Sequence, residues 1–221
     1  MINLVSNEGN VQKILDWTYE KVLIGIPGTY SVYELSNSYL SKNPTKDKAI
    51  DSLIRWQQSK AGANGFAAGL GGLISLPIAI PTNLVSVMYM QIRMIAAIAH
   101  IRGYDLKDDQ VQTFVYACLT GQSASDLIKQ NGIIIASKIG KVQVQRIPGK
   151  VLTQINQKVG FRLVTKAGEK GAVNLGKMIP LLGGVVGATF DASTTYIIGK
   201  AAKKTFIEGG YDNDNKIILE I

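Results

Sequence analysis

Apolar residues recur at helical spacing along most of the chain, and few segments alternate strictly between apolar and polar positions. Spacings of three and four residues are typical of helices that bury one face, whereas alternation is typical of strands. The pattern therefore predicts an all-α protein. We expect helices at residues 11–25, 31–40, 45–60, 84–101, 106–119, 125–141, 151–163 and 179–198, the last of them running on toward 206.

Residues that prefer helix ends mark several of these boundaries. Pro27 and Gly28 stop the first helix, and Thr45 is suited to cap the third. Asp105 is expected to cap the helix that starts at residue 106, and Gly121 follows the end of that helix. These signals agree with the helices that the apolar spacing predicts.

The most unusual stretch, residues 61–92, contains no charged side chain. Pro77 and Pro81 interrupt it, and Arg93 ends it. A membrane span needs about 20 apolar residues, and an arginine at its centre costs about 2.5–3.5 kcal/mol, so a simple span is not favoured. We expect a helical hairpin whose tip, between the two prolines, dips into lipid. The alternatives are the buried core of a soluble protein and an ordinary integral membrane protein.

Glycines in this stretch and in a second apolar segment have the spacing that lets helices approach closely. Gly65 and Gly69 form one GxxxG pair, and Gly183 and Gly187 form another. We therefore expect a single compact helical domain over residues 1–221, in which two glycine-rich apolar helical hairpins pack together. Its core spans about 11–206, and residues 209–221 form a loose tail.

Each apolar segment carries one charge, Arg93 in the first and Asp191 in the second. An unpaired buried charge costs several kcal/mol, so we predict that these two side chains form an ion pair. Ser86, Arg93 and His100 are spaced by seven and form one polar seam on their helix. The alternative for the two charges is a lipid-phosphate or ligand site, or a switch that opens on membrane contact.

The net positive charge is concentrated in the second half of the chain. Charged residues make up 18% of the composition, below the usual quarter, yet the net charge is +8. The region between Lys129 and Lys177 has a single acid, Glu169. We expect a basic surface there that docks on anionic headgroups, formed by Lys141, Arg146, Lys150, Lys158, Arg162, Lys166 and Lys170.

Two other interpretations of this basic region are a nucleic-acid surface and a solvated face. A nucleic-acid surface is not favoured, because the region holds only one aromatic residue for base stacking, Phe161. A solvated basic face without a partner is the second alternative.

The motifs indicate no catalytic, cofactor or metal site. The chain lacks G-x-S-x-G, Walker A and HExxH patterns. A lone cysteine and a lone histidine exclude a cysteine-cluster or multi-histidine metal site. Cys118 lies in an apolar helix and is interpreted as a small core residue, with a nucleophile–base pair of Cys118 and His100 as the alternative.

Several phrases of the sequence together resemble the EcsC family of bacterial proteins over residues 16–206. The strongest runs from Gln91 to Ala99 and is followed by Gly103-Tyr104-Asp105. The others are Tyr19-Glu20-Lys21, Ile26-Pro27-Gly28, residues 51–56, Gly69-Leu70-Gly71-Gly72, Leu76-Pro77, Ile80-Pro81, residues 159–163 and residues 180–191. The resemblance implies membrane-linked physiology, since the family is named after a gene beside those of an ABC transporter. Where many relatives have an acid after the second proline, this chain has Thr82-Asn83.

Together these features predict a peripheral membrane protein that binds anionic lipid. The first residues do not resemble a secretory signal, so we expect the protein in the cytoplasm, at the inner face of the bacterial plasma membrane. Further partners to consider are a second copy of the chain and a membrane protein. The functional alternatives are a membrane-permeabilising toxin or defence effector, and a soluble enzyme or carrier that modifies or binds lipid.

Overall fold

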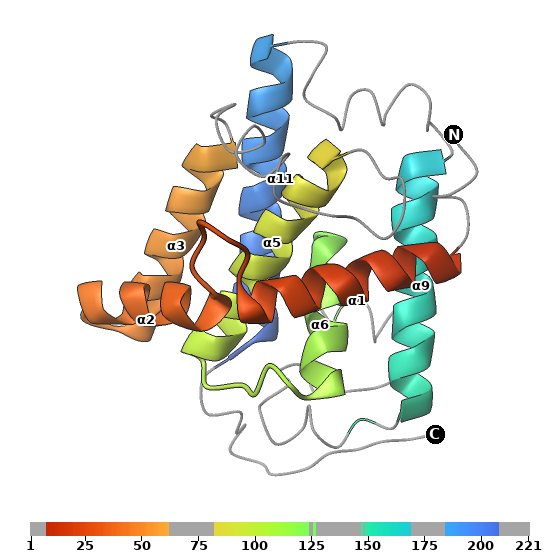
Figure 1. Ribbon diagram of the computed structural model, residues 1–221, viewed down its shortest axis with the longest axis horizontal. Coiled ribbons are helices and arrows are strands. Elements are labelled where there is room, and N and C mark those ends of the chain that lie inside the picture. Colours follow the sequence, from red (N-terminus) through yellow and green to blue (C-terminus); the bar gives the residue numbers. More distant parts are fainter. Residues whose placement is uncertain are drawn as a thin grey trace.

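The computed structural model describes residues 8–61, 82–123, 126, 147, 149–168 and 184–207, with side chains from 11–59, 87–123, 126, 147, 149–157, 159–160 and 192–207. Within these ranges the chain forms helices and turns and no strand (Figure 1). The predicted all-α class is confirmed. The helices are α1 (Glu8–Ile24), α2 (Val32–Lys42), α3 (Lys46–Ala61), α5 (Thr82–Ile101), α6 (Asp109–Leu119), α9 (Gly149–Gly168) and α11 (Gly184–Thr205).

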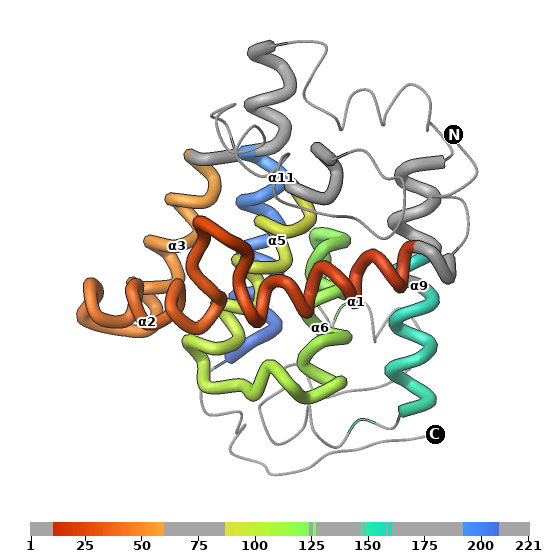
Figure 2. Tube along the Cα trace, viewed as in Figure 1, coloured from red at the N-terminus to blue at the C-terminus, as the bar shows by residue number. Residues whose placement is uncertain are grey.

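The central helix is α5, which packs against α1, α2, α3, α6 and α11 (Figure 2). The apolar residues between Ile92 and Ala99 are completely shielded from solvent. A helix that is apolar on all sides is stable only when other elements surround it. The second half of α5 therefore belongs to the core of the protein.

The end of α1 follows the predicted proline and glycine. Thr29 N donates a hydrogen bond to Ile26 O at 2.9 Å, which closes a turn over Pro27 and Gly28. Gly28 has a φ of +79°, a conformation that favours glycine. The turn leads directly into α2 and fixes the position of that helix relative to α1.

The start of α6 differs from the prediction. Asp105 does not cap a helix, because its Oδ1 accepts a hydrogen bond from Lys107 N at 3.0 Å inside a turn. The helix begins three residues later than expected, with Asp108 as its N-cap residue. Asp and Asn close such local turns as readily as they cap helices, which explains the error. The predicted stop at Gly121 is confirmed, since its φ is +79°.

The later helices match the prediction in part. Helix α9 is longer at both ends than the predicted range of 151–163. Helix α11 begins at Gly184, and residues 179–183 lie outside the described ranges. The same is true of the predicted tail at 209–221 and, apart from Asp126, of the predicted helix at 125–141.

Ion pairs fix the directions of three core helices. Arg102, just after α5, donates from Nη2 to Oδ1 of Asp47 at 2.7 Å. Lys203, near the end of α11, reaches Oδ1 of Asp47 at 3.2 Å and Oδ1 of Asp51 at 2.8 Å. Asp47 lies in the first turn of α3. Helix α3 is therefore antiparallel to both α5 and α11, and we call this cluster of charges the polar end.

The other end of the three helices is the distal end, which we define by Ala61, Thr82 and Gly184 (Figure 1). At 1.5 Å per helical residue it lies about 20–30 Å from the polar end. The charge-free residues 62–81 join α3 to α5 there, and residues 169–183 lead into α11 there. Two segments far apart in sequence thus attach to the bundle at the same end.

Helices α3 and α11 approach each other closely at Gly199. A Cβ atom on Gly199 would lie 2.8 Å from Cγ1 and 2.9 Å from Cγ2 of Ile54. Such distances are too short for any side chain larger than hydrogen. Gly199 was not among the predicted contact glycines, because it lacks a GxxxG partner.

Candidate functional site

Most of the predicted site residues lie outside the part of the chain that the structure describes. This applies to Pro77, Pro81, Gly65, Gly69, Gly183, Lys141, Arg146 and Lys170. Gly187 and Asp191 belong to α11, and Lys158, Arg162 and Lys166 belong to α9, but these side chains are not described either. The hairpin tip, the glycine contacts and the basic surface therefore stay predictions. Lys150 is exposed at the start of α9.

Arg93 is the one charged residue in the buried stretch of α5, and only 7% of it is exposed. Its Nε atom is buried and has no hydrogen-bond partner among the described residues. The described side chains also form no ion pair with it. Burial lowers the pKa of the Arg93 guanidinium, and the nearby Tyr89, Tyr39 and Glu34 oppose that shift.

The surroundings of Arg93 come from α2 and from the turn before it. Tyr89, one helical turn earlier on α5, forms a hydrogen bond between its hydroxyl and Oγ1 of Thr29 at 3.2 Å. Tyr39 of α2 is half-buried, and burial raises the pKa of its phenol while Arg93 opposes the rise. The face of α5 that carries Tyr89 and Arg93 therefore meets α2. The predicted pairing of Arg93 with Asp191 of α11 stays untested.

Glu34, the acid that influences the pKa of Arg93, accepts its described hydrogen bonds from another residue. Its Oε2 atom accepts hydrogen bonds from Ser31 N at 2.7 Å and from Ser31 Oγ at 2.8 Å. Glu34 N in turn donates to Ser31 Oγ, so the two residues form a capping box at the start of α2. The backbone hydrogen bond with Ser31 is the main reason that the pKa of Glu34 is lowered, and Arg93 adds a smaller contribution.

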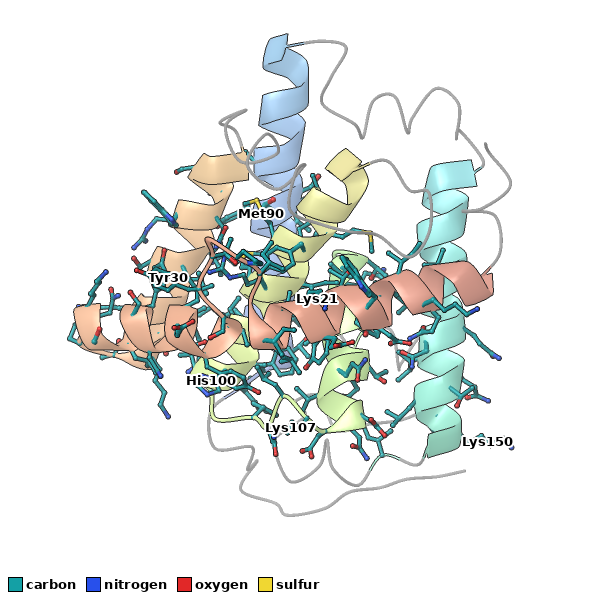
Figure 3. All side chains as sticks on the ribbon, viewed as in Figure 1. Lys21, Tyr30, Met90, His100, Lys107 and Lys150 are labelled. Atoms are coloured by element: carbon teal, nitrogen blue, oxygen red, sulfur yellow. The ribbon has the colours of Figure 1, made fainter. Side chains whose placement is uncertain are left out.

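His100, which shares the seam of Arg93, borders a shallow depression of about 250 Å³. Its ring packs edge-on against Tyr33 of α2, with 5.1 Å between the ring centroids. Residues 103–106 of the α5–α6 loop complete the lining, near the labelled His100 and Lys107 in Figure 3. The volume is below that of ordinary ligand pockets, so we assign no ligand to it. Burial lowers the pKa of the His100 imidazole, so this ring is neutral at pH 7.

A polar network between α1 and α6 was not predicted from the sequence. Oδ1 of Asp16 accepts hydrogen bonds from Gln12 at 2.9 Å, Gln112 at 3.1 Å and Tyr116 at 2.8 Å. Tyr116 is completely buried, and its ring packs edge-on against Tyr19. Burial is the main reason that the pKa of Tyr116 is raised. Gln112 and Tyr116 lie about 100 residues after Asp16 in the sequence, so no local pattern could indicate these two contacts.

The described residues hold no group of three or more His, Cys, Asp and Glu side chains that could bind a metal ion. Cys118 is completely buried, as expected of a core residue, and its Sγ donates to Oγ1 of Thr205 at 3.3 Å. His100 instead contacts Tyr33 of α2. The thiol and the imidazole thus have their described contacts with different helices, and this arrangement does not support a nucleophile–base pair.

None of the helices in the described ranges is both long and apolar enough to cross a bilayer. No curated protein and no solved structure matches the chain. The model of the EcsC protein family matches residues 11–207, which includes all helices from α2 to α11 and most of α1. This match covers most of the chain, and the protein therefore belongs to the EcsC protein family.

Proposed function

We propose that this protein is a peripheral membrane protein that binds anionic lipid with its distal end toward the bilayer. The observation that carries the proposal is the arrangement of charge along the helix bundle. The polar end gathers Asp47, Asp51, Arg102 and Lys203, whereas the charge-free segment 62–81 attaches at the distal end. A helix bundle with one charged end and one apolar end is amphiphilic. Such a bundle can bind at the membrane–water interface, with the charged end in water and the apolar segments toward lipid.

Negative charge is sparse next to the distal end. Residues 52–61 of α3 and 82–92 of α5 contain no Asp or Glu, whereas α11 holds Asp191 in its third turn and the segment that leads into it holds Glu169. Lys60 and Arg55 of α3 add positive charge near this end. An anionic membrane attracts each nearby basic residue by about 1 kcal/mol and repels acids, so the charge distribution favours this orientation.

Helix α9 adds to the attraction. From its middle onward it contains Lys158, Arg162 and Lys166, the whole helix has no acidic residue, and its Gly168 end lies on the distal side of the molecule in Figure 1, whereas Lys150 lies at the opposite end. Electrostatic attraction alone gives reversible binding that salt weakens. Insertion of the segment between Pro77 and Pro81 would make the bound state resistant to salt, because buried apolar area is insensitive to screening.

Flotation of the purified protein with vesicles tests the proposal. Vesicles of phosphatidylcholine and of phosphatidylcholine with phosphatidylglycerol are compared at low and high salt. We expect flotation only with the anionic vesicles when salt is low during binding, and retention when salt is raised afterwards. Absence of flotation under all four conditions would show that the proposal is wrong and that the glycine-rich segments serve as core.

A further inference from the structure

The large apolar side chains that the described residues expose lie at similar heights along the bundle, measured from the polar end toward the distal end. Each of these side chains is between 40% and 64% exposed. We call the set the belt, and its members are Ile24, Tyr30, Trp56, Tyr196 and Ile197. Single exposed apolar residues need no explanation, but a common height of several does.

The close approach of Gly199 and Ile54 fixes the height of three members of the belt. Trp56 lies two residues after Ile54 on α3, and Ile197 lies two residues before Gly199 on α11, which runs in the opposite direction. At 1.5 Å per residue, both positions are about 3 Å farther toward the distal end than this contact. Tyr196 lies one residue beyond Ile197 in the same direction.

The members of the belt on α3 and α11 point to opposite sides of this helix pair. Two residues of a helix are separated by about 200° of rotation. Ile54 faces α11, so Trp56 points away from α11, and Gly199 faces α3, so Ile197 points away from α3. The Cγ2 atom of Ile197 lies 3.2 Å from where a Cβ atom of Gly121 would be, at the end of α6.

The turn between α1 and α2 supplies the other two members. Ile24 and Tyr30 flank this turn, and the neighbouring Thr29 shares a hydrogen bond with the hydroxyl of Tyr89 at 3.2 Å. Tyr89 lies about 20 Å along α5 from the polar end. In Figure 3 the labelled Tyr30 is farther from the polar end than the labelled His100. The belt therefore occupies the middle of the bundle, about 10–20 Å from the polar end.

Charge is sparse on the distal side of the belt. Residues 57–61, 82–92 and 184–195 of the three helices hold only two charged residues, Lys60 and Asp191. A lysine near a helix end keeps its ammonium group in water while its methylene groups lie along apolar surface. Asp191 is the predicted partner in a buried ion pair. The belt thus marks the height at which the three helices change from charged to nearly uncharged.

The arrangement of the belt favours lipid over a protein partner. A protein partner buries one patch on each molecule, whereas a leaflet surrounds the end of a bundle that enters it. Trp and Tyr concentrate where acyl chains meet headgroups. Basic side chains accompany the rings here, because Lys200 Nζ lies 5.5 Å from the centroid of the Tyr196 ring and the exposed Arg55 precedes Trp56.

We infer that the belt lies at the headgroup level of an anionic leaflet, with the polar end in water and the distal ends of α3, α5 and α11 below the headgroups. The inference rests on the proposed membrane binding and adds to it a depth and a contact on more than one side of the bundle. The distal end is about 10 Å beyond the belt, which is the depth that amphipathic elements reach at an interface.

Single-tryptophan variants measure the depth. Trp17→Phe retains Trp56, and Trp17→Phe with Trp56→Phe accepts a new reporter through Tyr196→Trp or, as an exposed control in the α5–α6 loop, Lys107→Trp. Each variant is bound to phosphatidylglycerol vesicles brominated near the headgroup end or near the methyl end of the acyl chains. We expect the reporters at 56 and 196 to lose fluorescence mainly with bromine near the headgroups, and the reporter at 107 to lose none.

Flotation of polar variants measures the energetic contribution of the belt. Trp56→Gln and Ile197→Gln each remove apolar area from the interface and should weaken vesicle binding about 5–10-fold. Lys200→Gln should weaken it about fivefold. Lys48→Gln, the matched control at an exposed lysine of the polar end, should change it less than about twofold, because screening reduces its attraction. Glu34→Gln, at an exposed acid one turn after Tyr30, should strengthen binding.

The outcomes separate the belt from the membrane proposal. Absence of flotation by the wild type would contradict both. If the wild type floats and the reporter at 196 keeps its fluorescence while Trp56 is quenched, one side of the bundle contacts lipid, and the belt is wrong while membrane binding stands. Quenching of the reporter at 107 would also overturn the belt. If Trp56→Gln and Ile197→Gln float normally but abolish self-association of the lipid-free protein in sedimentation, these side chains form an interface between copies.

Discussion

Asp47 in the first turn of α3 accepts a hydrogen bond from Arg102, which follows the last turn of α5, at 2.7 Å. The guanidinium side chain is only 7% exposed, whereas the carboxylate is 60% exposed. This contact joins residues 55 positions apart and defines which end of the bundle is polar. It also makes Asp47 a sensitive point for stability.

Replacing Asp47 by Ala should destabilise the protein by about 1–2 kcal/mol, because it removes one partner of Arg102 and one partner of Lys203. Solvent screening of the exposed carboxylate keeps the loss below that of a fully buried pair.

Hydrogen bonds from Arg102 and Lys203 lower the pKa of Asp47, so its contribution is present at neutral pH and is lost as the pH falls below about 4. Urea unfolding at pH 7 and pH 3 measures both effects. Glu20→Gln, at an exposed acid, is the control and should change stability by less than about 0.5 kcal/mol.

Gly199→Ala should cost about 1–3 kcal/mol, because the new Cβ would overlap the side chain of Ile54. Gly149→Ala is the matched control, since a Cβ at that position meets nothing within 4 Å. In a background of Ile54→Ala the cost of Gly199→Ala should fall, which a double-mutant cycle measures. Equal costs in the two backgrounds would mean that the helices do not approach each other at this point.

Stability should decrease between pH 7.5 and pH 5.5 because of His100. Burial lowers its pKa in the folded state below the unfolded value of about 6.5, so the unfolded chain binds more protons in this interval. Tyr33, Tyr104 and Asp105, which line the same depression, are the other titratable groups beside the ring. His100→Gln should reduce the pH dependence of the unfolding free energy. An unchanged dependence would assign it to other groups.

Tyr116→Phe should destabilise the protein by about 1–2 kcal/mol. The ring fills the same space, but the hydroxyl no longer donates to Asp16 at 2.8 Å or accepts from Gln112 at 2.6 Å, which leaves a buried polar network incomplete. Tyr30→Phe is the control, because Tyr30 is 64% exposed (Figure 3). Equal stability of both variants would show that water replaces the lost hydrogen bonds.

The two tryptophans report on the orientation at a membrane. Trp56 is 53% exposed and lies five residues, about 8 Å, before the distal end of α3. Trp17 belongs to α1, which contacts the α5–α6 loop through the hydrogen bond from Tyr19 to Leu106 at 2.8 Å. Brominated phosphatidylglycerol vesicles should therefore quench Trp17→Phe, which retains Trp56, more strongly than Trp56→Phe. The reverse order would place another surface of the protein on the lipid.

Local sequence patterns determined much of the helical structure. The spacing of apolar residues predicted the helical class and most helix ranges, because helix formation depends on neighbours three and four residues away. Pro27 with Gly28, and Gly121, marked turns correctly, since their backbone preferences are intrinsic. The prediction that Asp105 caps a helix was wrong, because an aspartate can either close a turn or cap a helix. Which of the two it does depends on the backbone conformation of the residues that follow it.

The candidate sites depend on contacts between distant parts of the chain. The sequence singled out Arg93 as a charge in an apolar helix, and burial of that side chain agrees with this. It could not indicate that the face of Arg93 lies toward α2 and its Tyr39, or that Glu34 is held by its own helix cap. Nor could it show that Asp16 accepts a hydrogen bond from Tyr116, or that the side chain of Ile54 packs against Gly199. Helix formation is decided by near neighbours, whereas burial and pairing of a charge are decided by the relative placement of whole helices, which the packing of the core alone determines.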